Sequence, residues 1–147
     1  MKNFLIICTV AFGFMACEKD AGEGGTSIIE GKVIYFKTAF NTATSQRDTF
    51  VYPKAGKDVF IIYSNDKGEI YDDNFETDHN GKYSFEYVRK GEYTIVTYVD
   101  SFIMDPNDAS EILVTWDSPI YKDVKITSNS STNKADDFMI DKTFPLE

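Results

Sequence analysis

Cysteine and histidine, on which many small exported and catalytic proteins depend, are almost missing from this sequence. Its 147 residues include two cysteines and one histidine. Cys8 lies in an apolar N-terminal run and the other cysteine is Cys17, so we expect no disulfide within the domain and a core that must stabilise it alone. A catalytic triad, a Cys–His pair or a zinc site would each need His79. One histidine without a free thiol argues against all three.

Positive charge and helical periodicity are also scarce. Lysine and arginine number 15 against 24 acidic residues, which gives a formal net charge of −9. Such an acidic chain is not expected to bind nucleic acid or to present a basic patch to a membrane surface. After the N-terminal run, no window of eleven residues keeps a clean 3.6-residue period without glycine, proline or a β-branched run. The sequence therefore predicts no long helix.

The N-terminus carries the one long apolar run. Residues 1–3 form a short basic segment, and residues 4–14 form an apolar run. This run is too short to span a bilayer as a helix, but it is typical of the core of a signal peptide. The sequence Phe14-Met15-Ala16-Cys17 that follows resembles the lipobox of bacterial lipoproteins. The family prefers leucine at the place of Phe14 and a smaller residue at the place of Met15.

The lipobox resemblance implies cleavage before Cys17 and acylation of its thiol and new amino group. We therefore expect a signal peptide over residues 1–16, a flexible acidic and glycine-rich tether over 17–26, and a domain over 27–147. Lipid on Cys17 would hold the protein to the outer membrane, on its periplasmic or its surface-exposed side. Each buried methylene contributes ~0.8 kcal/mol, so several acyl chains make a lasting anchor. The alternative is an ordinary secretory signal in which Cys17 is incidental.

A tight turn is predicted at Asp78, Asn80 and Gly81. Asp78 can accept hydrogen bonds from backbone N–H groups two residues on, and Gly81 can adopt a positive φ at little cost. The spacing from Glu76 to Gly81 also imitates the first half of a calcium-binding loop, but the twelfth position is Tyr87 instead of glutamate. We interpret the turn as structural, with His79 in solvent, and expect no metal site and no cofactor.

Alternating polar and apolar residues, with turn signals between them, predict seven to eight short strands in an antiparallel β-sandwich. Tyr83, Phe85 and Tyr87 are expected to be buried together on one of these strands. Residues 37–52 are polar and rich in threonine, and we expect a long loop there that ends in a short edge strand over 49–52. Further loops are expected over 101–110 and 127–135. The expected strands cover residues 28–36, 58–63, 69–75, 83–87, 93–99, 111–116, 121–126 and 137–142.

Four segments, taken in order, resemble the successive signatures of carboxypeptidase-regulatory-like domains. They are residues 31–33, 55–61, 77–85 and 90–95. Those domains are transthyretin-like (prealbumin-like) seven-stranded sandwiches, close in shape to the Cna-B domains of surface adhesins. The resemblance covers residues 31–99 and departs from the family in a long insertion over 37–53. It implies a prealbumin-like fold and a non-catalytic role as spacer, scaffold or accessory domain.

Aromatic and apolar residues late in the chain are the candidates for a binding surface. Phe102, Ile103 and Met104 are expected in an apolar loop, with Trp116 and Tyr121 on short strands. Aromatic rings in loops could stack on sugars or hold a peptide. The alternative is that these side chains complete the core. A set of coplanar exposed rings would favour the binding interpretation.

The sequence thus predicts a lipid-anchored, non-catalytic protein of the cell envelope that serves as an accessory or scaffold domain. A carbohydrate- or peptide-binding surface module is the alternative, with an envelope protein or a glycan as partner. A hydrolase using loop carboxylates is a third hypothesis. It is the weakest, because aspartate is common in turns for structural reasons.

Overall fold

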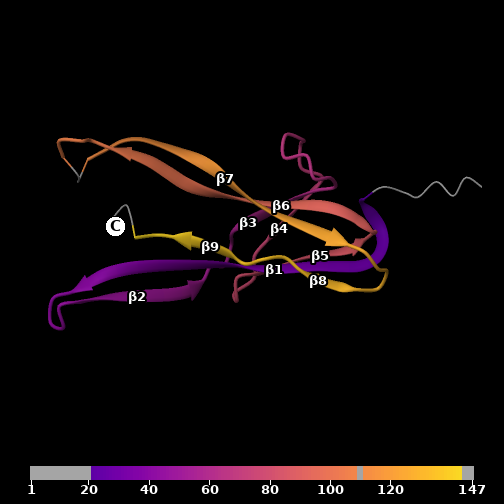
Figure 1. Ribbon diagram of the computed structural model, residues 1–147, viewed down its shortest axis with the longest axis horizontal. Helices are drawn as coiled ribbons and strands as arrows, with labels where there is room; N and C mark the ends of the chain where they lie inside the picture. The colour runs from indigo at the N-terminus through magenta and orange to yellow at the C-terminus, as the bar shows by residue number, and fades with distance from the viewer. Residues whose placement is uncertain (1–20, 109–110, 144–147) are drawn as a thin grey trace, which may run out of the picture.

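The computed structural model describes residues 21–108 and 111–143, and over these residues the chain forms nine strands and no helix (Figure 1). The expected signal peptide and Cys17 lie outside the described residues. Within them, no helix is long and apolar enough to cross a membrane. The strands are β1 (Glu23–Asn41), β2 (Gln46–Pro53), β3 (Asp58–Ile62), β4 (Asp73–Glu76), β5 (Lys82–Val88), β6 (Gly91–Met104), β7 (Ile112–Ile126), β8 (Thr132–Lys134) and β9 (Phe138–Asp141).

The first sheet is built on β1, which pairs with four other strands. β5 and β2 pair with it antiparallel, while β8 and β9 pair with it parallel. The partner changes from β5 to β2 at Val33, whose N–H donates to Gly81 O (2.8 Å) and whose carbonyl accepts from Lys54 N–H (2.9 Å). One long strand therefore runs through the whole sheet with partners at both edges.

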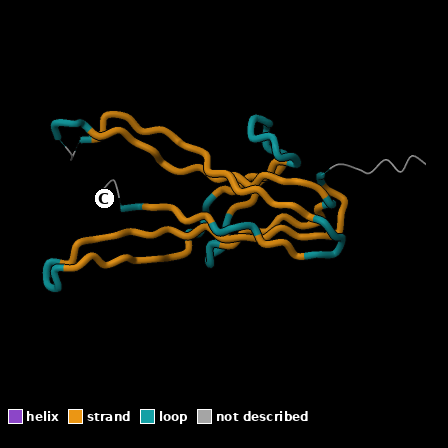
Figure 2. Tube along the Cα trace, viewed as in Figure 1, coloured by secondary structure: helices purple, strands orange, loops and turns teal. Residues whose placement is uncertain are grey.

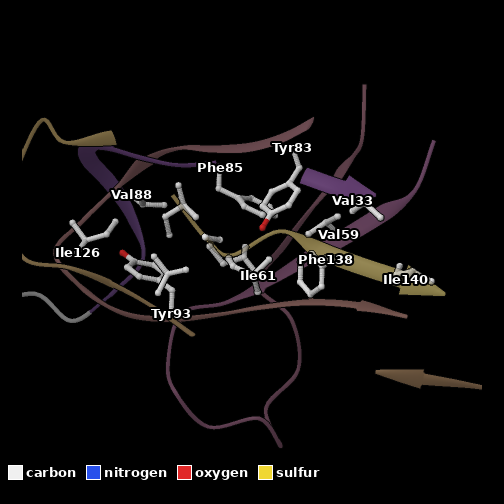
Figure 3. Packing of buried hydrophobic residues seen from close by; sticks show 14 of the residues in the cluster. Val33, Val59, Ile61, Tyr83, Phe85, Val88, Tyr93, Ile126, Phe138 and Ile140 are labelled. Carbon is white, nitrogen blue, oxygen red and sulfur yellow. The ribbon is translucent and has the colours of Figure 1, made fainter. Parts of the chain in front are cut away.

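The second sheet has the order β4-β3-β6-β7 and is antiparallel throughout. The inward faces of the two sheets enclose the hydrophobic core, so the expected all-β sandwich is confirmed, with nine strands in place of seven or eight. Figure 3 shows side chains from both sheets meeting in this core. Its completely or almost completely buried members include Ile29, Val33, Val59, Ile61, Tyr83, Phe85, Tyr93, Ile95, Ile126 and Phe138.

The long loop expected over residues 37–52 is wrong, although the short edge strand expected over 49–52 lies within β2. β1 continues to Asn41 and β2 returns from Gln46 to Pro53, so the segment is a long hairpin. Asn41 closes its turn, because the side-chain carbonyl accepts hydrogen bonds from the backbone N–H groups of Ala43 and Thr44. Much of this ribbon is exposed, so its sequence lacks the apolar alternation that marks a half-buried strand.

Four further strands differ from expectation. β6 runs on to Met104, so residues 102–104 lie in a strand instead of a loop. The two strands expected around Pro119 are one continuous β7, because an edge strand tolerates a residue that lacks an N–H group. The strand expected over 69–75 is reduced to β4, and β8 lies inside the loop expected over 127–135.

The tether expected over 17–26 is also wrong at its C-terminal end. β1 begins at Glu23, and Gly22 already belongs to the fold. The carbonyl of Gly22 accepts a hydrogen bond from Arg89 N–H, and its N–H donates to the Tyr93 hydroxyl. A Cβ on Gly25 would collide with the backbone of Val88. Close packing, and not flexibility, therefore explains the glycine at this position.

Tyr87 is exposed, against the expectation of three buried aromatics on one strand. Tyr83 and Phe85 are buried, but Tyr87 has a φ of 59° and 69% of its surface is exposed. The left-handed backbone at Tyr87 interrupts the alternation of inward and outward side chains, so Val88, and not Tyr87, points into the core. The pairing of β5 with β1 shifts its register at the same place.

The turn at Asp78 and Gly81 has the predicted geometry. Asp78 Oδ1 accepts hydrogen bonds from the N–H groups of Asn80 (2.8 Å) and Lys82 (2.9 Å), and Gly81 has a φ of 69°. A Cβ on Gly81 would lie 2.5 Å from the carbonyl oxygen of Val33. Gly81 therefore needs both its left-handed backbone and its missing side chain, where β1 changes partners.

We predict that Gly81→Val lowers the free energy of unfolding by at least ~1–3 kcal/mol, the usual cost of a strained backbone conformation, because the branched side chain also meets Val33 O. His79→Ala is the control, since the exposed ring is hydrogen-bonded to the neighbouring Asn80 amide and its loss should change stability by less than ~0.5 kcal/mol. Urea unfolding of both variants beside the parent measures the difference. A Gly81→Val midpoint equal to that of the parent would contradict this account of the turn.

Candidate binding cleft

Two hairpin arms extend from the same end of the sandwich. One is the far half of β1 with β2, and the other is the far half of β6 with the first half of β7. Figure 2 shows them diverging on the left, and Figure 1 shows the beginning of β1 at the opposite end. A two-stranded ribbon is only marginally stable in water, so each arm depends on the side chains at its base, where it joins the sandwich.

A cleft of about 850 Å³ lies between the bases of the arms and is open to solvent. Its walls come from both sheets, so residues distant in the sequence meet there. Aromatic rings and lysines predominate among the side chains. The lining residues are Tyr35, Lys37, Tyr52, Lys54, Gly56, Lys57, Asp100, Phe102, Thr115, Trp116, Asp117 and Lys142.

Tyr35 lies where the core ends and the cleft begins. It is 9% exposed and belongs to the core cluster. Its ring meets that of Tyr52, its partner across the β1–β2 ladder, edge to face at 6.1 Å. The ammonium groups of Lys54 and Lys142 lie 5.7 Å and 5.2 Å from the Tyr35 ring centroid, within the range of a cation–π contact. Burial raises the pKa of the Tyr35 hydroxyl, and the charge of Lys142 opposes this shift.

An ion pair between Lys142 and Asp100 joins the two sheets across the cleft. Lys142 follows β9 and Asp100 is on β6, and Nζ donates to Oδ2 at 2.5 Å. The hydrogen bond from Lys142 is the main cause that lowers the pKa of the Asp100 carboxyl, and the charges of Lys142 and Lys57 add to it. Because 62% of the Asp100 side chain is exposed, solvent weakens the pair, and its role is to hold Lys142 in place more than to stabilise the fold.

Both arms contribute exposed rings to the cleft, Tyr52 from the first arm and Trp116, which is 45% exposed, from the second. Tyr52 is 43% exposed, and Phe50, which follows on the same face and pairs with Lys37, is 57% exposed. On the second arm Phe102 pairs with Thr115, whereas Trp116 pairs with Ser101. Neighbouring cross-strand pairs point to opposite faces of a ribbon, so Phe102 and Trp116 do not form one flat platform.

The structure brings together only two of the five residues proposed as a binding surface. Phe102 and Trp116 line the cleft. Ile103 is exposed on the second arm, and Met104 ends β6. Tyr121 lies instead in a smaller hollow of about 250 Å³, beside Tyr71 and Tyr98. The coplanar set of rings that would have favoured the binding interpretation is thus not formed by Trp116 and Tyr121.

Sequence reasoning missed the residues at the centre of the cleft. Tyr35 and Tyr52 were expected on the strand over 28–36 and the short edge strand over 49–52, and neither Lys54 nor Lys142 was expected in a binding surface. Only the spacing of the two tyrosines across the hairpin could have pointed to the pair, and that required the hairpin to be recognised. The approach of Lys142 to Asp100 spans 42 residues, and no local pattern signals it.

Several of the loop aspartates considered for a hydrolase accept hydrogen bonds from nearby backbone groups. Asp72 accepts from Tyr63 N–H, and Asp105 accepts from Asn107 N–H. Asp78 does the same in its turn, and the hydrogen bond from Lys82 N–H lowers the pKa of its carboxyl. Over residues 21–108 and 111–143, no group of three or more His, Cys, Asp or Glu side chains is placed to hold a metal ion.

Comparison with known proteins identifies no family. No protein-family model and no curated protein matches the chain. One similar solved structure is a Pseudomonas aeruginosa protein described as a "putative carbohydrate binding protein". The two are 11% identical, with a TM-score of 0.45 over 83% of this chain and 92% of the other. A likeness this distant carries no argument about ligand or activity.

We predict that Asp100 titrates below its ordinary pKa of 3.8, and that Lys142→Met raises this pKa, because the variant removes the hydrogen bond and the charge. A folded-state pKa below the unfolded one means that the contact contributes stability above the unfolded pKa, and that this contribution is lost as the pH falls through the folded pKa. Carboxyl NMR titration measures the shift. Lys125→Met, which breaks the ion pair with Glu92 away from the cleft, is the control. An Asp100 pKa that is unchanged in Lys142→Met would contradict the assignment.

Proposed function

We propose that the protein is a lipid-anchored, non-catalytic binding module of the cell envelope, and that the cleft between its two arms holds the ligand. The observation that carries this proposal is the cleft itself, where exposed rings and lysines are fixed to a rigid core through Tyr35. A scaffold domain that works through its shape alone has no need of exposed Tyr52 beside a lysine-rich wall. The cleft therefore favours the binding module over the accessory or scaffold role.

The ends of the molecule support an anchored arrangement. A lipid on Cys17 would lie a few residues before β1 in the sequence, and the arms lie at the opposite end of the sandwich from the beginning of β1 (Figure 1). β1 covers 19 residues, which at ~3.3 Å per residue corresponds to roughly 60 Å when fully extended. An anchor at Cys17 would hold the cleft away from the membrane, where it could reach a ligand outside the lipid surface.

The chemistry of the cleft fits a glycan. Aromatic rings offer large apolar faces at a small entropic cost, and the charged side chains between them can bind polar groups. The walls are formed by side chains. Non-catalytic binding is further supported by the aspartates that are occupied in turns and by the exposed position of His79.

We predict that a glycan and envelope-protein screen on the mature chain from residue 18 finds a ligand that the cleft binds. Tyr52→Ala and Phe102→Ala should each weaken its binding at least about tenfold, or ~1.4 kcal/mol, because each removes a ring from one wall. Tyr121→Ala, in the hollow away from the cleft, should bind as the parent does. Surface plasmon resonance measures the affinities. A ligand whose binding depends on Tyr121 and ignores Tyr52 would place the site elsewhere.

We predict that Cys17→Ser releases the protein from membranes without unfolding it, because the lipid would lie outside the core. Membrane fractionation of cells that produce the parent and the variant tests this, with thermal unfolding as the control for folding. A Cys17→Ser protein that stays in the membrane fraction through a carbonate wash would overturn the lipid anchor, and it would leave the binding role of the cleft to be judged on its own.

A further inference from the structure

We infer that the ligand of the cleft is a polyanionic glycan, a sugar polymer that carries carboxylate or sulfate groups. This inference rests on the proposed function, since it names the chemical class that the same cleft would bind. It assigns a role to the four lysines of the cleft. Packing in the core does not account for them, and the ion pair with Asp100 accounts only for Lys142.

The first argument is the reversal of charge in the cleft. Acidic residues outnumber basic ones by nine over the whole chain. Among the lining residues there are four lysines against two aspartates, a local charge of +2. Lysines gathered in one concave site of an acidic protein raise the local concentration of anions there, while the rest of the surface repels them.

The second argument is the crowding of cations around one ring. The ammonium groups of Lys54 and Lys142 lie 5.7 Å and 5.2 Å from the same centroid, so the two nitrogens are at most about 10.9 Å apart. Salt at physiological ionic strength largely screens charges more than about 8 Å apart, so the two ammonium groups repel each other appreciably where their separation is shorter than this. Asp100 pairs with Lys142, and Lys57 acts on the same carboxylate. An anionic group between the lysines would relieve this repulsion.

The third argument concerns the sugar. Tyr52 is half-exposed at the wall and is held edge to face against buried Tyr35, so its orientation is fixed before a ligand arrives. Phe50 continues the same face of the arm away from the core. A row of exposed rings leading out of a lysine-lined cleft suits a chain of sugar units better than a single small anion, because successive units can contact successive rings. Inorganic phosphate alone would use the lysines and leave the rings unused.

The test measures binding of matched polymers to the mature chain from residue 18 by isothermal titration calorimetry. Oligogalacturonate is compared with its methyl ester, and dextran sulfate with dextran, so that each pair differs mainly in charge. At least one acidic polymer should bind at least tenfold more tightly than its neutral counterpart, and its affinity should fall as salt rises. The pair that shows the difference identifies carboxylate or sulfate as the recognised group. Poly-L-glutamate, an acidic peptide, should bind at least tenfold more weakly.

Variants separate this inference from the proposed function. The double variant Lys37→Gln/Lys54→Gln should lose at least tenfold in affinity for the acidic polymer, whereas Lys125→Gln, away from the cleft, should not. Equal binding of acidic and neutral polymers, both lost in Tyr52→Ala, would overturn the polyanion and keep the cleft as a glycan site. Equal binding of poly-L-glutamate would overturn the glycan in favour of an acidic peptide. If none of the four sugar polymers bound, the inference would be overturned. If the glycan and envelope-protein screen also found no ligand, the proposed function would be overturned as well.

Discussion

The structure depends on the hydrogen bonding of a single strand, β1, at both of its edges. Its first half lies between β5 and β8 and its second half pairs with β2 and β9, with the exchange of antiparallel partners at Val33. The same strand places Ile29 and Val33 in the core and Tyr35 at the border of the cleft. Core and cleft residues therefore lie on the same strand, and the pairing register of β1 that the core fixes also sets the position of the cleft.

The cleft holds charged, hydrated side chains that a hydrophobic core would exclude, yet it is attached to the rigid core. Lysine is rarely buried, and four lysines gather here only because the arms diverge and admit solvent. Two of them, Lys54 and Lys142, approach the Tyr35 ring, and Lys142 also pairs with Asp100 on the opposite sheet. A site organised in this way keeps its charges hydrated and still presents them in fixed directions.

The sequence predicted the parts of the fold in which one face of a strand is buried. The strands at residues 58–62 and 138–141 and the turn at Gly81 were found, because alternation and turn chemistry are local signals. Only parts of the arms were predicted, at residues 49–52 and 111–116, because ribbons exposed on much of their surface have no apolar face to mark them. Tyr87 was misplaced because one left-handed residue shifts the alternation after it. Of the cleft, only Phe102 and Trp116 were foreseen, since the meeting of Tyr35 with Lys142 depends on pairing between distant strands.

The two-sided bonding of β1 also bears on how the molecule would respond to force. Its N-terminal end lies on the side of the proposed anchor, and its other end forms one wall of the cleft (Figure 1). A polymer dragged by flow while bound in the cleft would pull β1 along its own length. Hydrogen bonds that lie across the direction of pulling must then break together, whereas those of a peeled hairpin break one after another. The connectivity that builds the sheet would thus make the link between membrane and ligand resistant to shear.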